Sequence, residues 1–255
     1  MSRQKLAVVK KLLQKKYREE EGKFIIEGWK SIEEAVNASV PIDTVIYDEQ
    51  RSGDKKLISR IKKNGAELLG VAAKDVDSLS DAVSSQGVIA VLPKLPSLHL
   101  LANFLHRESA LIVAVEQIND PGNLGTIIRT CDWFGVDAVV IGEKSVELYN
   151  PKVVRATMGS LFHLPVIDNA DLVSFFKKSR HEGFSIYSTE LNESSDFRTI
   201  KWEKKSILVI GNESHGVSND VSALADHRVK IPALGKAESL NAAMACGIIL
   251  ARMKL

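Results

Sequence analysis

The second half of the sequence repeats one pattern, in which a nearly continuous apolar run is followed by a helix pattern. The runs read LIVAV (111–115), DAVVIG (137–142), FSIYS (184–188), SILVIG (206–211) and HRVKI (227–231). Strands that are apolar at successive positions are buried on both faces, which is typical of a parallel sheet covered by helices. The pattern therefore predicts an α/β domain with a parallel sheet over residues 108–255.

A shorter α/β region precedes it. Residues 93–99 read PKLPSLH, and their prolines interrupt both strand and helix, so we predict a linker over 93–107. Before the linker, apolar runs at 24–26, 44–47, 66–71 and 87–92 alternate with amphipathic helix patterns at 29–36 and 55–61. Since 45% of the 255 residues are hydrophobic, the chain can bury a normal core in each region. We expect a first domain over residues 1–92.

Basic residues gather in the first third of the chain. Residues 1–18 contain seven Lys or Arg and no acid, and residues 51–63 contain six against a single acid. Such clusters suit a polyanion, because each phosphate contact releases condensed counterions, although a solvated helix face is the alternative. Lys15, Lys16 and Arg18 are the candidate RNA contacts in this region.

Other features bear on location and on metal binding. No apolar run approaches the roughly 20 residues that span a bilayer, and the N-terminus lacks the apolar centre of a signal peptide. Cys131 and Cys246 both fall in apolar helix patterns, which fits core positions in a reduced cytoplasm. None of the six histidines forms a spaced zinc-type pair with cysteine or acid. We expect a cytoplasmic protein without membrane or metal partners.

Three polar loops follow apolar strand patterns and run into helix patterns, at residues 119–129, 208–218 and 231–251. Together they predict one ligand pocket at the strand ends. The first loop offers only G-x-x-G where a dinucleotide fold needs G-x-G-x-x-G. The second resembles a phosphate-binding loop, but Val217 occupies the lysine position and Glu213 would repel a triphosphate. Dinucleotide binding and nucleotide hydrolysis are therefore disfavoured.

The same loops carry a specific set of motifs: Asn123-x-Gly125-x-x-x-Arg129, then GNESHG (211–216), then SLN (239–241). In this order, each after an apolar strand, they resemble the three motifs of the SpoU/TrmH family of RNA ribose 2′-O-methyltransferases, within the SPOUT class. The resemblance covers about residues 108–255 and includes the stretch 150–166. Residues 18–36 are similar, over a shorter and less specific match, to the family's auxiliary RNA-binding domain, a small α/β unit resembling a ribosomal protein.

This resemblance implies a deep trefoil knot in the C-terminal domain, S-adenosylmethionine held by the knot loops, and a homodimer with shared active sites. It implies ribosomal RNA as the substrate, because of the auxiliary domain, with transfer RNA as the alternative. A non-catalytic RNA-binding protein would be favoured if Arg129 or Asn241 were missing, and both are present. A base methyltransferase is disfavoured by the ribose-type motif set.

Four residues would form the reaction centre by the same resemblance. A guanidinium stays protonated, so we expect Arg129 to bind a phosphate and stabilise the developing alkoxide instead of acting as a base. Asn123 would orient the substrate or Arg129, unless it only caps a helix. Glu213 would orient Arg129, position the ribose or accept the proton, unless it only supports its loop. Asn241 would lie beside the target nucleotide, although Asn also caps helices well.

The resemblance assigns the cofactor contacts to Thr189, Gly211, Ile231, Ser239 and Leu240. Glycine lets the backbone approach a ligand closely, while Ile231 and Leu240 would hold the adenine between them. Arg155 and Ser160 match the family's segment that reaches the partner's active site or the RNA. Departures from the commonest family pattern at Ser214-His215 and Ala242-Ala243 leave the fine substrate preference open.

Overall fold

The computed structural model describes residues 2–51, 55–81, 84–96, 106–191 and 194–255. Their contacts divide the chain into two compact units, the first formed by Met1–Leu95 with Tyr149–His163 and the second by Pro96–Leu148 with Leu164–Leu255. Residues 97–105, which make up most of the predicted linker, lie outside the described residues. Within the described part, no helix is both long and apolar enough to cross a membrane.

The first unit contains a mixed sheet whose four described strands follow the order β1-β4-β2-β3. Strand β4 (Val88–Pro93) is antiparallel to β1 (Lys23–Glu27) and β2 (Thr44–Asp48), while β2 is parallel to β3 (Glu67–Val71). These strands coincide with the apolar runs of the sequence. The accompanying helices are α1 (Ser2–Lys11), α2 (Lys15–Glu21), α3 (Trp29–Asn37), α4 (Lys55–Lys63) and α5 (Ala73–Asp77), with a 3-10 turn η1 (Glu49–Arg51).

A segment from far along the chain also belongs to the first unit. Helix α8 (Pro151–Ala156) packs against β1, and the 3-10 turn η2 (Ser160–Phe162) follows it. The Tyr149 ring lies 4.6 Å from the Phe24 ring, centre to centre. The sequence boundaries 1–92 and 108–255 therefore describe blocks of sequence, whereas packing joins residues 149–163 to the N-terminal block.

The second unit is built on a sheet of seven described strands in the order β7-β6-β5-β10-β8-β11-β9, and every pairing in it is parallel. Its strands are β5 (Ala110–Val115), β6 (Ala138–Gly142), β7 (Val166–Ala170), β8 (Ser185–Thr189), β9 (Ser195–Asp196), β10 (Lys205–Ile210) and β11 (His227–Lys230). This confirms the expected parallel sheet. Strands β7 and β9 were not expected, because neither carries a continuous apolar run.

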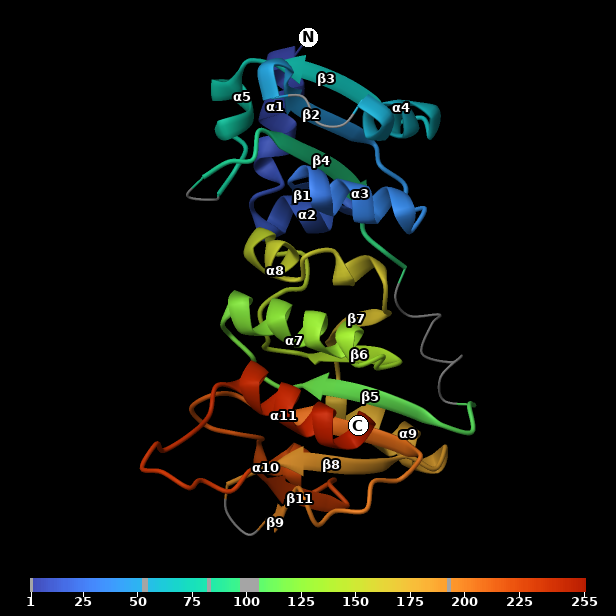
Figure 1. The fold of residues 1–255 in the computed structure, drawn as a ribbon, viewed down its shortest axis with the longest axis vertical. Helices are drawn as coiled ribbons and strands as arrows, with labels where there is room; N and C mark the ends of the chain where they lie inside the picture. The colour runs from blue at the N-terminus through green and yellow to red at the C-terminus, as the bar shows by residue number, and fades with distance from the viewer. Residues whose placement is uncertain (1, 52–54, 82–83, 97–105, 192–193) are drawn as a thin grey trace. The chain divides into compact units, whose positions relative to one another are not determined.

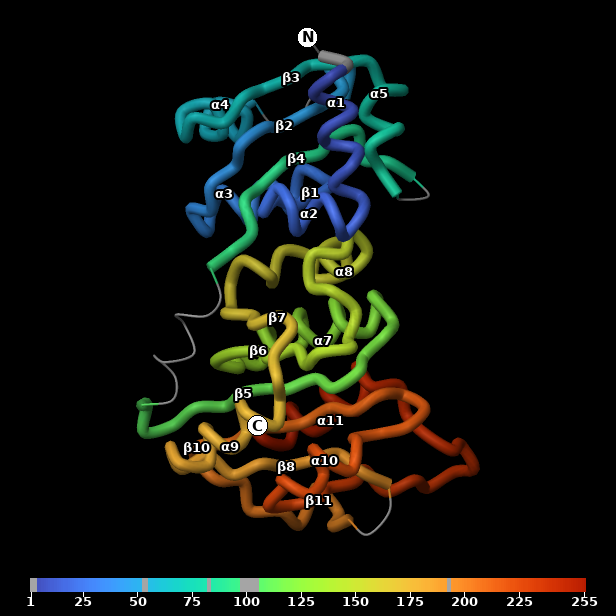
Figure 2. Tube along the Cα trace, turned by 180° about the vertical axis from the view of Figure 1, so that it is seen from behind, coloured from blue at the N-terminus to red at the C-terminus, as the bar shows by residue number. Residues whose placement is uncertain are grey.

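Helices cover both faces of this sheet. Helix α7 (Pro121–Trp133) packs against β6, and α11 (Ala242–Lys254) packs against α7 and β10 (Figure 1). The view from behind brings α9 (Leu172–His181) to the front, where it contacts α10 (Asn219–Ser222) (Figure 2). Phe175 and Phe176 of α9 join Ile112, Ala114 and Ile186 of the strands in one buried cluster. The sheet therefore forms the rigid base from which the polar loops project.

Candidate functional site

The first polar loop ends at a well-defined helix start. The Asp120 carboxylate accepts a hydrogen bond from the Asn123 N–H at 2.7 Å, and Pro121 occupies the first helical position of α7. Both are favourable choices at a helix N-terminus. Because α7 begins shortly after the central strand β5 ends, Asn123 lies near the carboxyl edge of the sheet, where ligands of parallel α/β folds bind.

Side chains from all three polar loops meet in one chain of hydrogen bonds. The Asn241 amide nitrogen donates to the Asn123 side-chain oxygen at 2.8 Å. The Asn123 amide nitrogen in turn donates to Glu213 Oε1 at 2.6 Å. The structure therefore brings together three of the four residues expected at the reaction centre, although 90 and 118 residues separate the partners in sequence.

Arg129, the fourth of these residues, stands apart from that chain. It lies on α7, six residues beyond Asn123, which is about 9 Å along a helix axis. Its side chain is exposed and makes no hydrogen bond or ion pair with any residue that the structure describes. Its guanidinium is therefore available to an external anion.

The second polar loop is closed by its own backbone and anchored to β5. Asn212 and Gly216 exchange two backbone hydrogen bonds, of 3.0 and 2.9 Å. A Cβ on Gly211 would lie only 2.4 Å from the Gly216 carbonyl carbon, so this position requires glycine. Buried Glu116 accepts from the N–H and the hydroxyl of Ser218, at 2.8 and 2.5 Å. The loop that carries Glu213 is thus held at both ends.

The expected cofactor residues lie at the end of β8 and in the loops after β10 and β11. Thr189 ends β8 and donates its hydroxyl proton to the Val209 carbonyl at 2.9 Å. Ile231 is half-buried, whereas Ser239 and Leu240 are exposed. Leu234, in the same loop, is 97% exposed. Exposed apolar side chains beside tight backbone loops fit a ligand that has an aromatic base and polar groups.

Helices α7 and α11, which carry Asn123 and Asn241, pack through two cysteines. Cys131 and Cys246 are both free thiols and fully buried. Burial, reinforced by the adjacent Cys246 thiol, raises the pKa of Cys131 well above its ordinary value. The expected core role of both cysteines is therefore consistent with their surroundings.

The candidate RNA contacts of the first unit divide into two groups. Lys15 and Lys16 are exposed on α2, and the Lys16 ammonium lies 5.9 Å from the centre of the Tyr17 ring. Arg18 is only 2% exposed and donates to the Leu12 carbonyl at 2.7 Å, so it fixes the corner between α1 and α2. Ser160 is also buried, at 6% exposed. Both side chains are thus buried within the protein's own fold, whereas Lys15 and Lys16 are exposed.

Three structural residues of the site were missed by the sequence analysis. Asp120 could have been found from the Asp-Pro start of α7, which is a capping signal. Glu116 gave no such signal, because its partner Ser218 lies 102 residues away. Asn212 donates to the Gln117 carbonyl at 2.8 Å and accepts from the Ser214 N–H at 2.8 Å, which joins the second loop to the end of β5 just before the first loop.

Comparisons with known proteins match both parts of the chain. The model of the SpoU rRNA Methylase family matches residues 110–251, and that of the MRM3-like substrate binding domain matches residues 4–90. The 23S rRNA (guanosine(2553)-2′-O)-methyltransferase RlmP of Bacillus subtilis is 30% identical over 252 residues, covering 98% of this chain and 96% of its own.

Solved structures are also similar over nearly the whole chain. An AdoMet-bound rRNA methyltransferase from Sinorhizobium meliloti has a TM-score of 0.86 and 31% identity, covering 97% of this chain and 92% of its own. The SpoU methyltransferase AviRb of Streptomyces viridochromogenes, in complex with AdoMet, has a TM-score of 0.87 and 29% identity, covering 97% and 96%. The motifs, the parallel sheet and these matches agree, and the chain belongs to the SpoU rRNA methylase family.

Proposed function

We propose that the protein transfers a methyl group from S-adenosylmethionine to the ribose 2′-hydroxyl of a nucleotide in ribosomal RNA. The observation that carries this proposal is the hydrogen-bonded chain Asn241–Asn123–Glu213, which joins the three loops at the carboxyl edge of the sheet. The curated relatives support the reaction class, because RlmP is named as a 23S rRNA 2′-O-methyltransferase.

The loops around Gly211 and Leu240 would hold the cofactor. The backbone packs so closely around Gly211 that this position has no room for a side chain. Leu240 is 48% exposed, and Ile231 is half-buried. Apolar side chains beside a tight loop suit an adenine ring, as expected for S-adenosylmethionine. Thr189 and Ser239 would add polar contacts. When bound, the cofactor supplies a methyl group on a sulfonium, which is already electrophilic.

The protein's own residues then have to place the 2′-oxygen and accept its proton. The hydrogen bond from Asn123 occupies Glu213 Oε1, and among the described residues Glu213 has no other side-chain partner. Its Oε2 is therefore free to accept a hydrogen bond from the ribose hydroxyl and to take the proton. Asn123 cannot rotate without breaking one of its two hydrogen bonds, so the carboxylate keeps its orientation.

Arg129 would bind the phosphate next to the target ribose. An exposed guanidinium without protein partners is suited to this, because it loses no internal ion pair when an anion arrives. The same charge would stabilise negative charge that develops on the 2′-oxygen. Arg129 is thus assigned to substrate binding and charge stabilisation, and Glu213 to the proton.

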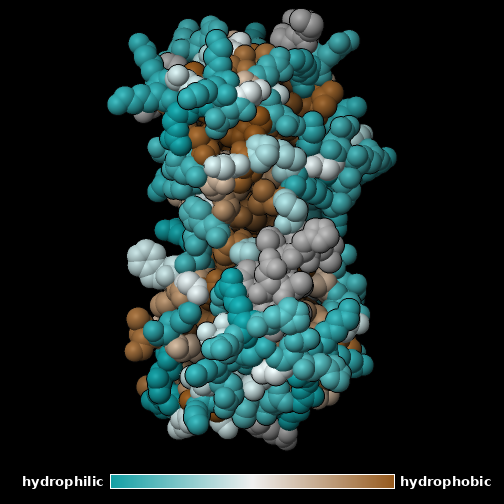
Figure 3. Space-filling model, turned by 90° about the vertical axis from the view of Figure 1, so that its right-hand side faces the viewer, coloured by the Kyte–Doolittle hydropathy of each residue, from teal (hydrophilic) through white to brown (hydrophobic). Residues whose placement is uncertain are grey.

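A homodimer is also part of this proposal. Trp133 at the end of α7 is 85% exposed, and Met244 near the start of α11 is 61% exposed. On the face drawn in Figure 3, hydrophilic side chains cover most of the surface and apolar side chains are visible between them. Large apolar residues on two adjacent helices suit a self-complementary contact between two copies.

The trefoil knot is proposed on the path of the last segment. Strand β11 pairs with β8 and β9 near one edge of the sheet, whereas α11, which follows it in sequence, packs against α7 and β10. The chain therefore returns from the edge of the sheet to its middle before it ends, as threading through an earlier loop requires.

Lys15, Lys16 and the other exposed basic residues of the first unit would guide RNA to a cytoplasmic enzyme of this kind.

Methylation with tritiated S-adenosylmethionine tests the proposal. Purified protein is incubated with ribosomal RNA and, separately, with transfer RNA, and the labelled RNA is digested with alkali. Label in ribosomal RNA within dinucleotides that resist alkali supports ribose methylation, and label confined to transfer RNA shifts the substrate to the alternative.

Two variants test the role assigned to Arg129. Arg129→Ala should lower methyl incorporation at least about 10²-fold, because it removes the donor that stabilises the developing charge. The Arg129 side chain is exposed and has no partner among the described residues, so the fold should not be affected. Arg252→Ala removes another exposed arginine, on α11, and should retain activity. Cofactor binding without labelling of either RNA, including immature ribosomal particles, would favour the non-catalytic RNA-binding alternative.

A further inference from the structure

A buried carboxylate in the first unit depends on a residue from far along the chain. The Glu27 side chain is 8% exposed and ends strand β1. The Ser80 hydroxyl lies 2.8 Å from each of its oxygens, and the Gln86 N–H donates to it at 3.2 Å. Among the residues that the structure describes, Arg155 of α8 is the one cation that pairs with it, at 3.5 Å.

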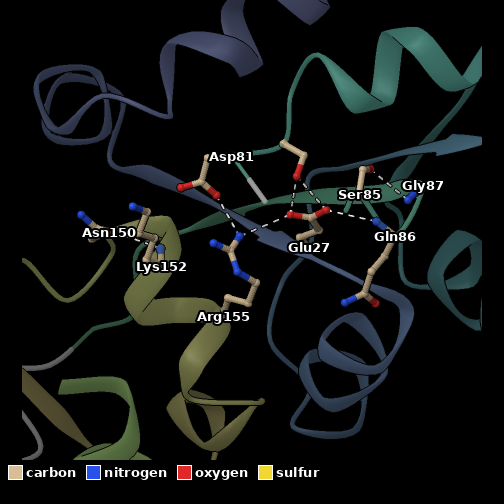
Figure 4. Close-up of polar contacts among 9 residues, drawn as sticks. Glu27, Asp81, Ser85, Gln86, Gly87, Asn150, Lys152 and Arg155 are labelled. Carbon is tan, nitrogen blue, oxygen red and sulfur yellow. Dashed lines mark hydrogen bonds and ion pairs between the residues drawn. The ribbon is translucent and has the colours of Figure 1, made fainter. Parts of the chain in front are cut away.

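Arg155 is shared between two carboxylates. Its Nη1 contacts Asp81 Oδ1 at 2.8 Å as well as Glu27 Oε2, and Figure 4 shows both carboxylates directed at the guanidinium. The Arg155 and Asp81 side chains are 31% and 28% exposed. A cavity of about the size of one water molecule adjoins the contact and is lined partly by Leu79, Pro151 and Val154. These apolar neighbours strengthen the pairing by limiting the access of water.

Two other contacts hold the same segment on the first unit. At its start, the Tyr149 hydroxyl accepts from the Leu95 N–H at 2.9 Å. At its end, His163 Nε2 lies 3.4 Å from Glu34 Oε2. Between these points, a Cβ on Gly159 would lie 2.6 Å from Glu34 Cγ, so the turn lies directly against α3. Residues 149–163 are therefore held against the rest of the first unit at both ends and, through Arg155 and Gly159, between them.

In sequence, residues 149–163 are inserted between two strands of the second unit's sheet. They lie between β6 and β7, two neighbouring strands of that sheet. The chain accordingly passes between the two units at three places, after residues 95, 148 and 163. Residues 149–163 are thus directly continuous in sequence with β6 and β7 of the unit that holds Asn123 and Glu213.

We propose that Glu27 and Asp81 are positioning residues for the use of RNA, and that they act through Arg155 by seating residues 149–163. The proposal rests on the methyltransferase function proposed above. It assigns Arg155 to an internal contact instead of an RNA phosphate. One guanidinium between two carboxylates leaves these three groups with a net negative charge, which repels a phosphate, whereas Arg129 pairs with no carboxylate among the described residues.

Removing the Asp81 charge separates this proposal from direct RNA binding by Arg155. If Asp81 positions the segment, Asp81→Asn and Arg155→Met should each raise KM for ribosomal RNA about tenfold, the effect of losing about 1.4 kcal/mol of binding. Affinity for S-adenosylmethionine should not change. The effects should not add in the double variant, because both changes break the same Arg155–Asp81 contact. If Arg155 binds RNA, Asp81→Asn removes one of the two carboxylates that compete with a phosphate for its guanidinium, and KM should fall or stay constant, which overturns the proposal.

Two further variants sharpen the test. Both contacts of Arg155 use one nitrogen, so the single ammonium of Arg155→Lys should restore part of the wild-type KM. Asp77→Asn removes an equal charge from α5, where the carboxylate is exposed and has no side-chain partner among the described residues. It should keep the wild-type KM. An equal rise in KM for Asp77→Asn would mean that the change in the protein's net charge causes the effect, and it would also overturn the proposal.

Hydrogen exchange provides a readout that does not need activity. Amides of residues 149–163 should exchange at least about tenfold faster in Asp81→Asn and Arg155→Met than in the wild type, while those of β5 and β10 should keep their protection. Unchanged exchange in the segment would refute the seating. If the wild-type protein methylates no RNA, the proposed function fails by itself, and the exchange result still decides whether these carboxylates hold the segment.

Discussion

Asn241 combines two roles that substitutions can separate. Its side-chain oxygen accepts from the N–H groups of Ala243 and Met244 at 3.0 and 3.2 Å, and thereby caps α11. Its amide nitrogen donates to Asn123 at 2.8 Å. Replacing a helix cap with alanine costs about 1 kcal/mol. Asn241→Ala should therefore lower the free energy of unfolding by about that amount, and the melting temperature by about 2–4 °C.

Asn241→Asp is the matched variant. Its carboxylate still accepts from both N–H groups, and the positive end of the helix favours its charge, so stability should stay close to that of the wild type. The donor is lost, however, and two acceptor oxygens would then face each other where the 2.8 Å hydrogen bond was. Asn123 could relieve this only by turning its amide, which breaks the hydrogen bond to Glu213.

The expected result is that both Asn241 variants lose activity but only one loses stability. Misplacement of the Asn123–Glu213 pair should lower methyl incorporation about 10²-fold in Asn241→Ala and in Asn241→Asp alike. Urea unfolding and incorporation of tritiated methyl into ribosomal RNA measure the two quantities. If Asn241→Asp is as active as the wild type, Asn241 is a helix cap alone, and the reasoning on the hydrogen-bonded chain is wrong.

Three other predictions concern the site and its supporting helices. Gly211→Ala should abolish cofactor binding measured by calorimetry and destabilise the protein by about 1–3 kcal/mol, because the added Cβ would overlap backbone atoms. The control Gly235→Ala places its Cβ in open space and should behave as the wild type. Equal cofactor binding by both variants would contradict this prediction. Glu213→Gln keeps an acceptor oxygen but loses the proton acceptor, so kcat should fall about 10²-fold with unchanged cofactor affinity, and an unchanged kcat would exclude the proton role. Cys131 and Cys246 are buried, and the pKa of Cys131 is raised, so iodoacetamide at pH 8 should label them only when urea unfolds the protein. The free energy of unfolding should also fall as pH rises above 9.0, the ordinary thiol pKa, because the unfolded chain loses the Cys131 proton before the folded chain does. Rapid labelling of the native protein would refute this reasoning.

The sheet strands were predictable where burial leaves a continuous signal. All six residues of β5 are buried, and its apolar run gives both its position and its parallel pairing. Strand β7 gives no such signal, because only Val166 and Ile167 of its five residues are buried. Its place at the edge of the sheet removes the need for apolar residues on every position.

The site was predictable as a set of loops but not as a set of contacts. Strand order brings the loops to one edge, whereas the donor and acceptor in each pair depend on side-chain geometry that spacing does not encode. Arg18 illustrates the other limit. It belongs to a basic cluster in the sequence, yet the turn between α1 and α2 directs it inward to a backbone carbonyl. Local charge patterns do not distinguish a buried arginine from its exposed neighbours.

The seating of residues 149–163 on the N-terminal block has a consequence for how such proteins can recombine. A chimera that exchanges only residues 1–95 with a relative would set a foreign surface against Tyr149, Val153 and Val154, which are all buried here. The exchange should succeed only if the segment travels with the block, or if both parents share the residues at the contact. In this protein, the first unit is therefore discontinuous in sequence, and substitutions in α8 are expected to covary with those in β1.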